Sequence, residues 1–528
     1  MNWSWDFPYP SRRMPVLARN VVATSQPLAA QAGLRMLLKG GNAVDAALAT
    51  AITLTVVEPT SNGIGSDAFA LVWDGQRLHG LNGSGRSPRA WTRERFAGHA
   101  EMPMYGWDAV TVPGAVDTWV KLSERFGSLP FAELFPPALE YGEKGFPVSP
   151  RIAAQWAEAE SLYRDFSEFG KTFLPAGRAP RAGEIFRCPD QARTLQAIAE
   201  SRGEALYRGS LADRVVACAR ASSAAMTLED LGLHEAEWVE PISIEYRGRR
   251  LHEIPPNGQG LAALIALGIL QNHEIAHYPV DSADSIHLQI EAMKIAFGEA
   301  HRHIADPAAM VAGVADLLEP GFLHERSKEI HMDRAAHPGS KVRTGGGTVY
   351  IAAADQSGMM VSFIQSNFCG FGSGIVIPGT GISMQNRAYG FVLEEGHPNS
   401  VAGGKRPFHT IIPGFVTREG RPVMSLGVMG RHMQPQGHVQ MMVRIFDYGQ
   451  NPQAACDAPR WHVTGDFTVA LEPGFPPETG EELRRRGHRC IETAPTSLFG
   501  GAQMIYLFEN GCCCAASDPR KDGQAAGY

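Results

Sequence analysis

The sequence predicts a mixed fold of the α/β (α+β) class, with helices concentrated in its first part and strands in its last part. Three observations lead to this prediction. Between residues 115 and about 340, apolar side chains recur at helical spacing in segments that Gly or Pro separates. From residue 348 onward, short β-rich runs predominate. Between these two parts lies the glycine run 345–347, which predicts a flexible, exposed joint.

The composition is that of a globular chain without an electrostatic field for nucleic acid. Its 528 residues are 44% hydrophobic and 20% charged, enough for a large core in one big or two moderate units. A net charge of -7, without a local Lys and Arg block, argues against binding to phosphate backbones. No apolar run forms a secretory core or approaches the roughly 18 residues of a membrane span. We therefore expect a cytoplasmic protein with no nucleic-acid or membrane partner.

The eight cysteines predict free thiols and not a disulfide framework. Five are scattered through the chain, and the other three are consecutive at 512–514. In a reducing compartment, such cysteines behave as small buried hydrophobic residues. A metal site of paired cysteines would need C-x-x-C spacing, which the sequence lacks.

Two helices and a hairpin are predicted near the N-terminus. Ser25 and Pro27 open an amphipathic run that the glycines 40–41 close as a C-cap would. Asn42 then caps a second helix, which is apolar on nearly all sides, and we expect this helix to be buried in the middle of the protein. Two β-rich runs on either side of the Asp-Gly pair at 74–75 predict the hairpin.

The part after the glycine run is predicted to open with another hairpin. The segment TVYIAAAD-QSG-MMVSFIQS, residues 348–366, contains two strand-like runs around a short turn. Strands predominate from there to the end, with helices predicted at 435–448 and 475–487. The sequence has no internal repeat and no low-complexity tract, so a repeat architecture is not expected.

Thr348 is a candidate nucleophile for self-cleavage because it follows a glycine run and precedes a predicted strand. Its hydroxyl group can attack the Gly347 carbonyl to form an ester that water cleaves, and glycine permits the backbone geometry that this needs. Cleavage would give Thr348 an α-amine with an ordinary pKa near ~8, able to take the hydroxyl proton as general base. The simpler alternative is a glycine-rich loop that ends at a strand with a β-branched first residue.

A series of motifs resembles the γ-glutamyltransferase family across nearly the whole chain, in matching order and spacing. The motifs are GGNAVDAALATAITLTVVEPTSNGIGSDAF at 40–69, TVPGAVDTW at 111–119, RFGSLPF at 125–131, TVYIAAADQSGMMVSFIQSN at 348–367, FGSG at 371–374, GKRPFHTIIP at 404–413, GVMGRHMQPQGHVQ at 427–440, DAPRW at 457–461 and ASDPRKDG at 516–523. The resemblance implies a four-layer αββα N-terminal-nucleophile hydrolase fold. It also implies self-cleavage into a large subunit, 1–347, and a small subunit, 348–528, which associate in one compact unit and leave a homodimer of that pair open.

The resemblance further implies site residues. The nucleophilic threonine of the family falls on Thr348 when Asp355 and Gly358 are placed on the family's Asp-x-x-Gly turn. Ser366 takes the place of a threonine whose hydroxyl group supports the nucleophile.

Gly430 and Arg431 take the places of paired glycines whose backbone N–H groups form the oxyanion hole of the family. One such donor is worth about 10²–10³ in rate in known cases. Backbone donors tolerate the change from Gly to Arg if the backbone dihedral angles do.

The residues that bind a γ-glutamyl group in the family are mostly replaced here. Gly390 stands where the family has an aspartate, His409 and Thr410 where it has a serine pair, and Phe368 where it has an asparagine. The carboxylate-binding arginine of the family is displaced to Arg86. Loss of the acidic partner for an amine removes a charge-assisted bond worth about 1.5–3 kcal/mol, so we expect glutathione to be a poor substrate.

Within the family, this pattern is most similar to the branch that includes oxamate amidohydrolase and some cephalosporin acylases. Arg86, His409 and Arg431 offer positive charge and donors to a small substrate carboxylate, and Asn367 and Thr410 join them as candidate substrate-binding residues. The expected reaction is hydrolysis of oxamate to oxalate and ammonia, without a cofactor or metal. The alternatives are a glutathione hydrolase or γ-glutamyltransferase, or a cephalosporin-type acylase.

Three of these residues also have purely structural interpretations. Arg86 lies beside a predicted hairpin, where its side chain could cap backbone carbonyl groups. Arg431 could be a solvated surface arginine. His409, in an apolar strand, could be a core histidine with satisfied hydrogen bonds.

The literal motif His273-Glu274-x-x-His277 raises a different class, a zinc metalloprotease, in which two histidines on one helical face would bind zinc. His287 and Glu291 are possible further ligands. The context disfavours this alternative, because an apolar helix is ending before the motif and a proline follows it closely.

The remaining alternative is a non-catalytic binding protein that keeps the fold with an inert Thr348. An uncleaved chain would favour it. No glycine motif of a nucleotide-binding loop is present.

Overall fold

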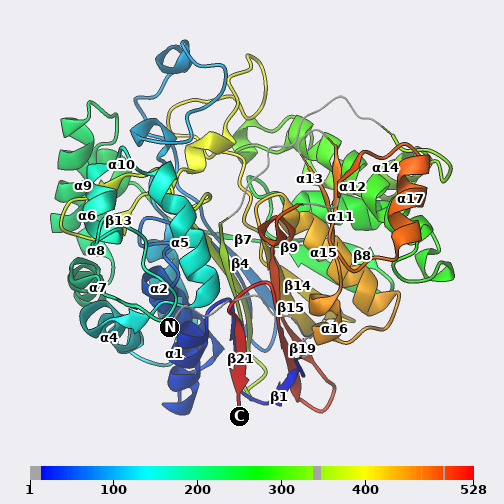
Figure 1. The fold of residues 1–528 in the computed structure, drawn as a ribbon, viewed down its shortest axis with the longest axis horizontal. Helices are drawn as coiled ribbons and strands as arrows, with labels where there is room; N and C mark the ends of the chain where they lie inside the picture. The colour runs from blue at the N-terminus through cyan, green and yellow to red at the C-terminus, as the bar shows by residue number, and fades with distance from the viewer. Residues whose placement is uncertain (1–12, 337–346, 465–466, 492–493) are drawn as a thin grey trace.

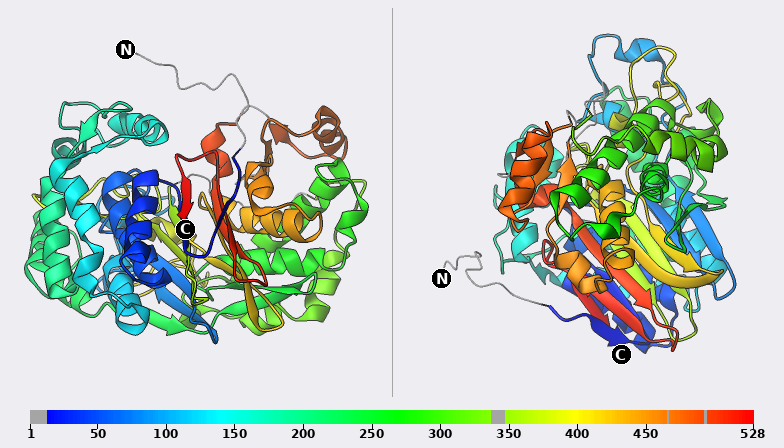
Figure 2. Two further views of the ribbon diagram at one scale, coloured as in Figure 1. Left: turned by 90° about the horizontal axis from the view of Figure 1, so that it is seen from below. Right: turned by 90° about the vertical axis from the view of Figure 1, so that its right-hand side faces the viewer.

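Two β-sheets lie face to face in the middle of the molecule, and helices cover the outer face of each sheet (Figure 1, Figure 2). The computed structural model describes residues 13–336, 347–464, 467–491 and 494–528. The order of the layers is helix, sheet, sheet, helix, which confirms the predicted mixed α/β class.

Both sheets have seven strands, and every strand pair within them is antiparallel. The first sheet has the order β1 (Val16–Ala18), β20 (Cys513–Ser517), β19 (Gly501–Leu507), β15 (Arg421–Met429), β14 (Gly414–Arg418), β9 (Arg249–Glu253) and β8 (Ile242–Tyr246). The second has the order β21 (Gln524–Gly527), β2 (Val21–Thr24), β10 (Val349–Ala354), β11 (Met360–Ser366), β3 (Asp67–Trp73), β4 (Leu78–Gly83) and β7 (Glu237–Val239). Each sheet therefore combines strands from before and after the Gly347–Thr348 bond.

Both predicted hairpins are confirmed. β3 pairs with β4, and β10 pairs with β11 in a register that runs from Val349 opposite Gln365 to Ala354 opposite Met360. Asp355 shapes the turn between β10 and β11: it accepts a hydrogen bond from the backbone of Ser357 at 2.8 Å. Its other oxygen accepts one at 2.7 Å from Ala43, the first residue of α2 (Ala43–Val57). The turn thus fixes the start of a buried helix as well as the hairpin.

Helix α2 (Ala43–Val57) is buried along its whole length, as predicted. Asn42 caps it: its side chain accepts bonds from the backbone of Val44 and Asp45, and the Asp45 carboxylate accepts one from the Asn42 backbone N–H. The helix packs against β10 and β11, so it supports the strands on either side of the turn.

The preceding helix α1 (Pro27–Leu38) begins differently from the prediction. Gln26 is its N-cap, accepting bonds from the backbone of Leu28 and Ala29 at 2.6 and 3.2 Å. The Ser25 hydroxyl group instead donates to the buried Glu58 carboxylate at 2.5 Å. The interpretation of Ser25 as the cap was wrong because a long-range partner takes up its side chain.

The other helices fall into two groups on opposite sides of the sheets (Figure 1). Beside α1 and α2 lie α3 (Ala115–Phe126), α4 (Pro136–Lys144), α5 (Pro150–Leu162), α6 (Ser167–Phe173), α7 (Pro189–Ser201), α8 (Glu204–Tyr207), α9 (Ser210–Ala221) and α10 (Leu228–Gly232). The other group contains α11 (Gly260–Leu270), α12 (Ala283–His303), α13 (Val314–Leu317), α14 (Pro320–Ser327), α15 (Met433–Phe446), α16 (Pro452–Asp457) and α17 (Pro477–Arg485). The helices predicted at 435–448 and 475–487 correspond to α15 and α17.

Apolar side chains fill three layers, one between each sheet and its helices and one between the sheets. The sheets approach closely at Gly427, where an added Cβ atom would lie 2.2 Å from the ring of Tyr350. No helix within the described ranges is long and apolar enough to span a membrane, and the eight cysteines are free thiols.

Candidate active site

The hydroxyl group of Thr348 lies beside the carbonyl group of Gly347. Thr348 is 1% exposed, and its Oγ is 2.5 Å from the Gly347 oxygen and 3.2 Å from Ser366 Oγ. Ser366 Oγ also donates to the Gly347 oxygen at 2.9 Å and accepts a bond from the Phe368 backbone N–H at 2.7 Å. The structure therefore brings the predicted nucleophile, its predicted supporting hydroxyl group and the carbonyl to be cleaved into one hydrogen-bonded cluster.

The hairpin explains this arrangement. Thr348 directly precedes β10 and Ser366 ends β11, so the antiparallel register places the two hydroxyl side chains opposite each other. Gly347 has φ +146, and an added Cβ atom would lie 2.7 Å from the Gly370 backbone nitrogen. A glycine before Thr348 is thus required by close backbone approach.

Gln434 is a further neighbour of Thr348 that sequence reasoning missed. Its Nε2 lies 3.4 Å from Thr348 Oγ, and its Oε1 accepts a bond from the Ile412 backbone at 2.9 Å. Gln434 lies in the first turn of α15. Its position just after the Gly430 turn is the one feature of the sequence that could have identified it as a neighbour of Thr348.

Gly430 and Arg431 form the turn between β15 and α15, and both line the same cavity as Thr348. Their φ angles are +119 and +54, so Arg431 adopts a left-handed conformation that glycine would adopt without strain. The turn sits at the N-terminal end of a 14-residue helix, where the helix dipole favours negative charge.

The cavity at Thr348 has a volume of about 390 Å³. It is lined by Thr60, Ser61, Met104, Tyr105, Gln155, Glu158, Ala159, Leu162, Tyr163, Gly347, Thr348, Cys369, Gly370, Phe371, Met429, Gly430, Arg431, Pro495, Ser497, Leu498, Gly500 and Lys521. Its wall therefore combines aromatic rings and aliphatic side chains with a few charged groups.

Arg431 supplies a buried positive charge at this wall. Its guanidinium group lies 4.6 Å from the centroid of the Phe368 ring and contacts Cys369 Sγ. Burial lowers the pKa of Arg431 to about 10, against the opposing influence of Tyr163 and Tyr105, so the group remains charged at neutral pH. The interpretation of Arg431 as a solvated surface arginine was wrong, since the residue is 4% exposed.

Arg86 does not reach the Thr348 cavity. Its guanidinium group pairs with Asp306 at 3.0 Å and with Glu237 at 3.4 Å, and it also donates to the Gly404 carbonyl at 3.2 Å. It lines a separate cavity of about 340 Å³ together with Arg406. The structural interpretation of Arg86 as a cap for a backbone carbonyl fits these contacts.

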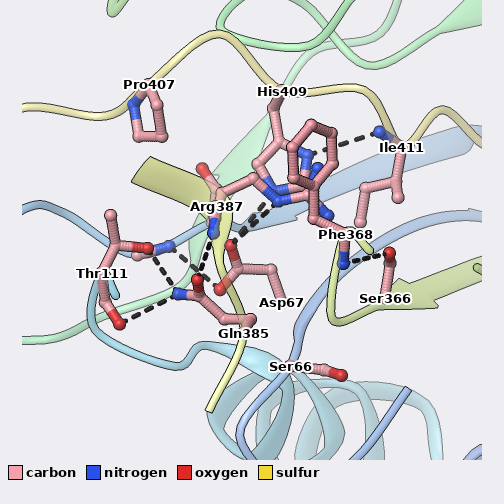
Figure 3. A network of polar contacts seen from close by, with 12 residues as sticks. Ser66, Asp67, Thr111, Ser366, Phe368, Gln385, Arg387, Pro407, His409 and Ile411 are labelled. Atoms are coloured by element: carbon pink, nitrogen blue, oxygen red, sulfur yellow. Dashed lines mark hydrogen bonds and ion pairs between the residues drawn. The ribbon is translucent and has the colours of Figure 1, made fainter. Parts of the chain in front are cut away.

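His409 and Thr410 are buried and do not line the cavity. Figure 3 shows His409 in a polar network with Asp67. His409 Nε2 is 3.0 Å from an Asp67 oxygen, and Thr410 Oγ1 accepts a bond from Arg387 Nη1 at 2.8 Å. Burial, with nearby arginines, holds the pKa of His409 well below its usual range, as expected for a neutral core histidine.

Asn367 is also fully buried and does not line the cavity. Its side chain accepts a bond from Ser66 Oγ at 2.8 Å and donates to Ser383 Oγ at 3.2 Å. Its contacts are those of a residue that holds the segment after β11 in place.

The motif His273-Glu274-x-x-His277 lacks the helix that its zinc-binding role requires. Helix α11 ends at Leu270, and inside the motif only Ile275–His277 form a short 3-10 turn. The two histidines are therefore not one turn apart on a continuous α-helix.

Within the described parts of the chain, His287, Glu291 and His488 are the one group of ligand-type side chains close enough to share a metal ion. Neither histidine of the zinc motif belongs to this group. The ammonium group of Lys294 already fills it, 2.8 Å from Glu291 Oε1 and 3.2 Å from His488 Nδ1. His287 completes the network with a 2.8 Å contact to His488. These contacts describe a buried ion-pair network.

The layered fold and the hydroxyl cluster at Thr348 are those of the N-terminal-nucleophile hydrolase class. The sequence profile described as Gamma-glutamyltranspeptidase matches residues 29–528. The chain therefore belongs to the gamma-glutamyltranspeptidase family, as the motifs indicated, and is a self-processing amidohydrolase of that family.

Similar proteins span nearly the whole chain. The Glutathione hydrolase-like YwrD proenzyme of Bacillus subtilis is 36% identical over 96% of this chain and 98% of its own. The Oxamate amidohydrolase proenzyme of Klebsiella pneumoniae is 36% identical over 95% of this chain and 97% of its own. Among solved structures, cephalosporin acylase from Bacillus halodurans is 49% identical with a TM-score of 0.95, covering 100% of this chain and 99% of that one.

Proposed function

We propose that this protein cuts itself between Gly347 and Thr348 and then uses Thr348 to hydrolyse the amide bond of a small substrate that carries a carboxylate. The observation that carries the proposal is the presence of Thr348, the Gly430 turn and the buried Arg431 guanidinium group on one cavity. A nucleophile, an oxyanion site and a positive charge are the groups that such a reaction needs.

Self-cleavage begins with attack of Thr348 Oγ on the Gly347 carbonyl carbon. The C–N bond breaks, its nitrogen takes up the proton from Oγ, and an ester joins the two residues. Water then hydrolyses this ester, leaving a carboxylate on Gly347 and an α-amine on Thr348. Ser366 donates to the Gly347 oxygen at 2.9 Å, so it stabilises the charge that develops there.

Substrate hydrolysis repeats this chemistry on an external amide. The Thr348 α-amine takes the Oγ proton, and Oγ attacks the substrate carbonyl carbon. The negative charge that forms on the oxygen is stabilised by the backbone N–H groups of Gly430 and Arg431 and by the N-terminal end of α15. The amine leaves with the proton, and water releases the acid from Thr348.

Oxamate is the first substrate to test, with oxalate and ammonia as products. Its carboxylate adjoins the scissile carbonyl group, which suits recognition by the Arg431 guanidinium group beside Thr348. The 36% identity to an oxamate amidohydrolase supports this choice. A γ-glutamyl substrate is less well matched, because Gly390 offers no carboxylate to its amine.

A cephalosporin-type acylase is the second candidate, favoured by the size of the cavity. A volume of about 390 Å³ far exceeds what oxamate occupies and falls in the range of about 300–1,000 Å³ that is typical of sites for drug-sized ligands. The 49% identity to a cephalosporin acylase supports this candidate.

The test compares the intact mass of the purified protein with that of Thr348→Ala and Thr344→Ala variants. We expect two fragments that meet at Gly347 and Thr348 for the natural chain and for Thr344→Ala, and a single chain for Thr348→Ala. The mature protein is then assayed with oxamate, a γ-glutamyl anilide and an N-acylated cephalosporin. An uncut natural chain would remove the mechanism and favour a binding protein.

A further inference from the structure

Arg387 is a fully buried arginine whose hydrogen-bonding capacity is only partly used. Nη1 donates to Thr410 Oγ1 at 2.8 Å, but Nε and Nη2 have no hydrogen-bond partner among the residues that the structure describes. The nearest carboxylate, Asp67, is 3.9 Å from Nε and accepts instead from His409. Because unpaired donors of a buried charge are costly, such a group calls for a functional explanation.

The two unused donors are the pair that a carboxylate recognises. Nε and Nη2 point along the same edge of the guanidinium plane, so the two oxygens of one carboxylate can bridge them side by side. Burial lowers the pKa of Arg387 to about 9, while Asp67 opposes this effect, and the group therefore remains charged at neutral pH.

Phe368 contacts both Arg387 and the arginine on the cavity wall. Its ring centroid is 4.5 Å from the Arg387 guanidinium carbon and 4.6 Å from that of Arg431. Arg431 lines the Thr348 cavity, whereas Arg387 is 0% exposed. Figure 3 shows the Phe368 ring against Arg387, on the segment that follows Ser366. The Phe368 ring therefore packs against both guanidinium groups, one that lines the cavity and one that does not.

Phe368 is also close to the reacting groups. Its backbone N–H donates to Ser366 Oγ at 2.7 Å, and that oxygen is 3.2 Å from Thr348 Oγ. An acyl chain on Thr348 that reaches the Arg431 guanidinium group would therefore come close to the Phe368 ring, which packs against that group.

We propose that Phe368 determines acyl-chain specificity by closing a carboxylate subsite formed by Arg387 beside Thr410. With the ring in place, the substrate carboxylate ends at Arg431, so short diacid amides are preferred. With the ring removed, longer acyl groups that end in a carboxylate reach Arg387. This inference rests on the proposed role of Thr348. The rival explanation is that Arg387 serves only as a structural partner of Asp67.

The experiment uses Phe368→Gly, because residue 368 has φ +77 and glycine adopts this conformation without strain. The full chain is matured, and kcat/KM is measured with the anilides of glutaric acid and of pentanoic acid. The two acyl chains have equal length, and only the first ends in a carboxylate. We expect the ratio of the two kcat/KM values to rise at least about tenfold, or about 1.4 kcal/mol.

Three further variants separate the proposal from a general loosening of the wall. Arg387→Met in the Phe368→Gly background should abolish the gain, and Arg387→Lys should restore part of it. Tyr105→Ala removes an aromatic ring that lines the Thr348 cavity and should give no charge-selective gain. A gain that survives Arg387→Met, or one that Tyr105→Ala reproduces, would overturn the proposal.

Separate measurements test the role of Thr348 and the role of Phe368. Intact mass and hydrolysis of a short substrate by the natural chain test the role of Thr348 alone. If Phe368→Gly does not mature, calorimetric titration of Thr348→Ala with and without Phe368→Gly measures binding of glutarate against pentanoate and needs no cleavage. Absence of an Arg387-dependent preference for glutarate in both the kinetic and the binding measurement would show that Phe368 closes no such subsite.

Discussion

Replacement of Arg431 by glycine separates two properties of this residue, its backbone and its charge. Arg431→Gly retains the backbone N–H group at the turn before α15 and removes the guanidinium group from the cavity wall. If the charge recognises the substrate carboxylate, this variant should mature normally and lose activity only towards substrates that carry one.

The magnitude follows from the contacts of Arg431. A hydrogen bond to a charged group is worth about 1.5–3 kcal/mol, which corresponds to a loss of about 10- to 150-fold in kcat/KM for oxamate. Stability should change little. Relief of the left-handed conformation at φ +54 gains about 1 kcal/mol, while loss of the contact with the Phe368 ring costs about 0.5–2 kcal/mol.

The assay compares oxamate with an uncharged anilide, with thermal denaturation of the same preparations as the control for folding. We expect a selective loss for oxamate and a midpoint within a few degrees of the natural chain. An equal loss for the charged and the uncharged substrate would refute the role of the guanidinium charge and leave only the backbone of Arg431 in the mechanism.

Three other predictions concern maturation, stability and pH. Ser366→Ala should slow self-cleavage at least about tenfold, because it removes a hydrogen-bond donor to the Gly347 carbonyl group, whereas Ser366→Thr should cleave at the natural rate. A time course of fragment formation by mass spectrometry measures both rates, and equal rates would contradict the prediction. Lys294→Met should lower the free energy of unfolding by about 3–5 kcal/mol, because it removes the ammonium group that pairs with the buried Glu291 carboxylate. Lys328→Met removes one partner of an exposed pair and should cost at most about 1 kcal/mol; a similar shift in both denaturation curves would contradict this. Burial lowers the pKa of His234 to about 3 and of His462 to about 4. As the pH is lowered below their unfolded value of 6.5, the unfolded chain binds more protons than the folded chain, so the free energy of unfolding should decrease by up to about 1.4 kcal/mol per pH unit for each histidine. Denaturation of His462→Gln over the same pH range should show a shallower decrease.

Local sequence patterns were sufficient to predict the hairpins and the capped and buried α2, whereas the pairing of Thr348 with Ser366 was predicted from the resemblance to the family. The hairpins and α2 depend on residues close together in the chain or on a strand register that a short turn sets. Gln434 was missed although it follows a predicted turn, because nothing in a helical pattern reveals which side chain faces a strand from elsewhere.

The roles predicted for Arg86 and His409 could not be judged from local sequence patterns. The acidic partners of Arg86 lie 220 and 151 positions away in the sequence, and the partner of His409 lies 342 positions away. A carboxylate that binds an arginine inside the protein leaves no local pattern, so a charge available to substrate cannot be told from one already paired. Arg387 illustrates the same limit from the other side, since its unused donors become evident only from its surroundings.

Both sheets contain strands from before and after the Gly347–Thr348 bond, and this arrangement explains how self-cleavage is compatible with a precisely placed nucleophile. β10 begins one residue after Thr348 and pairs with β2 from the first segment and with β11 from the second. Cleavage of the Gly347–Thr348 bond leaves all of these pairings intact, and separation of the fragments would require both sheets to come apart. The new α-amine would therefore sit at the start of a central strand, held by its hydrogen-bonded neighbours, and not on a free chain end. A general base on the same residue as the nucleophile can then be positioned by the sheet itself.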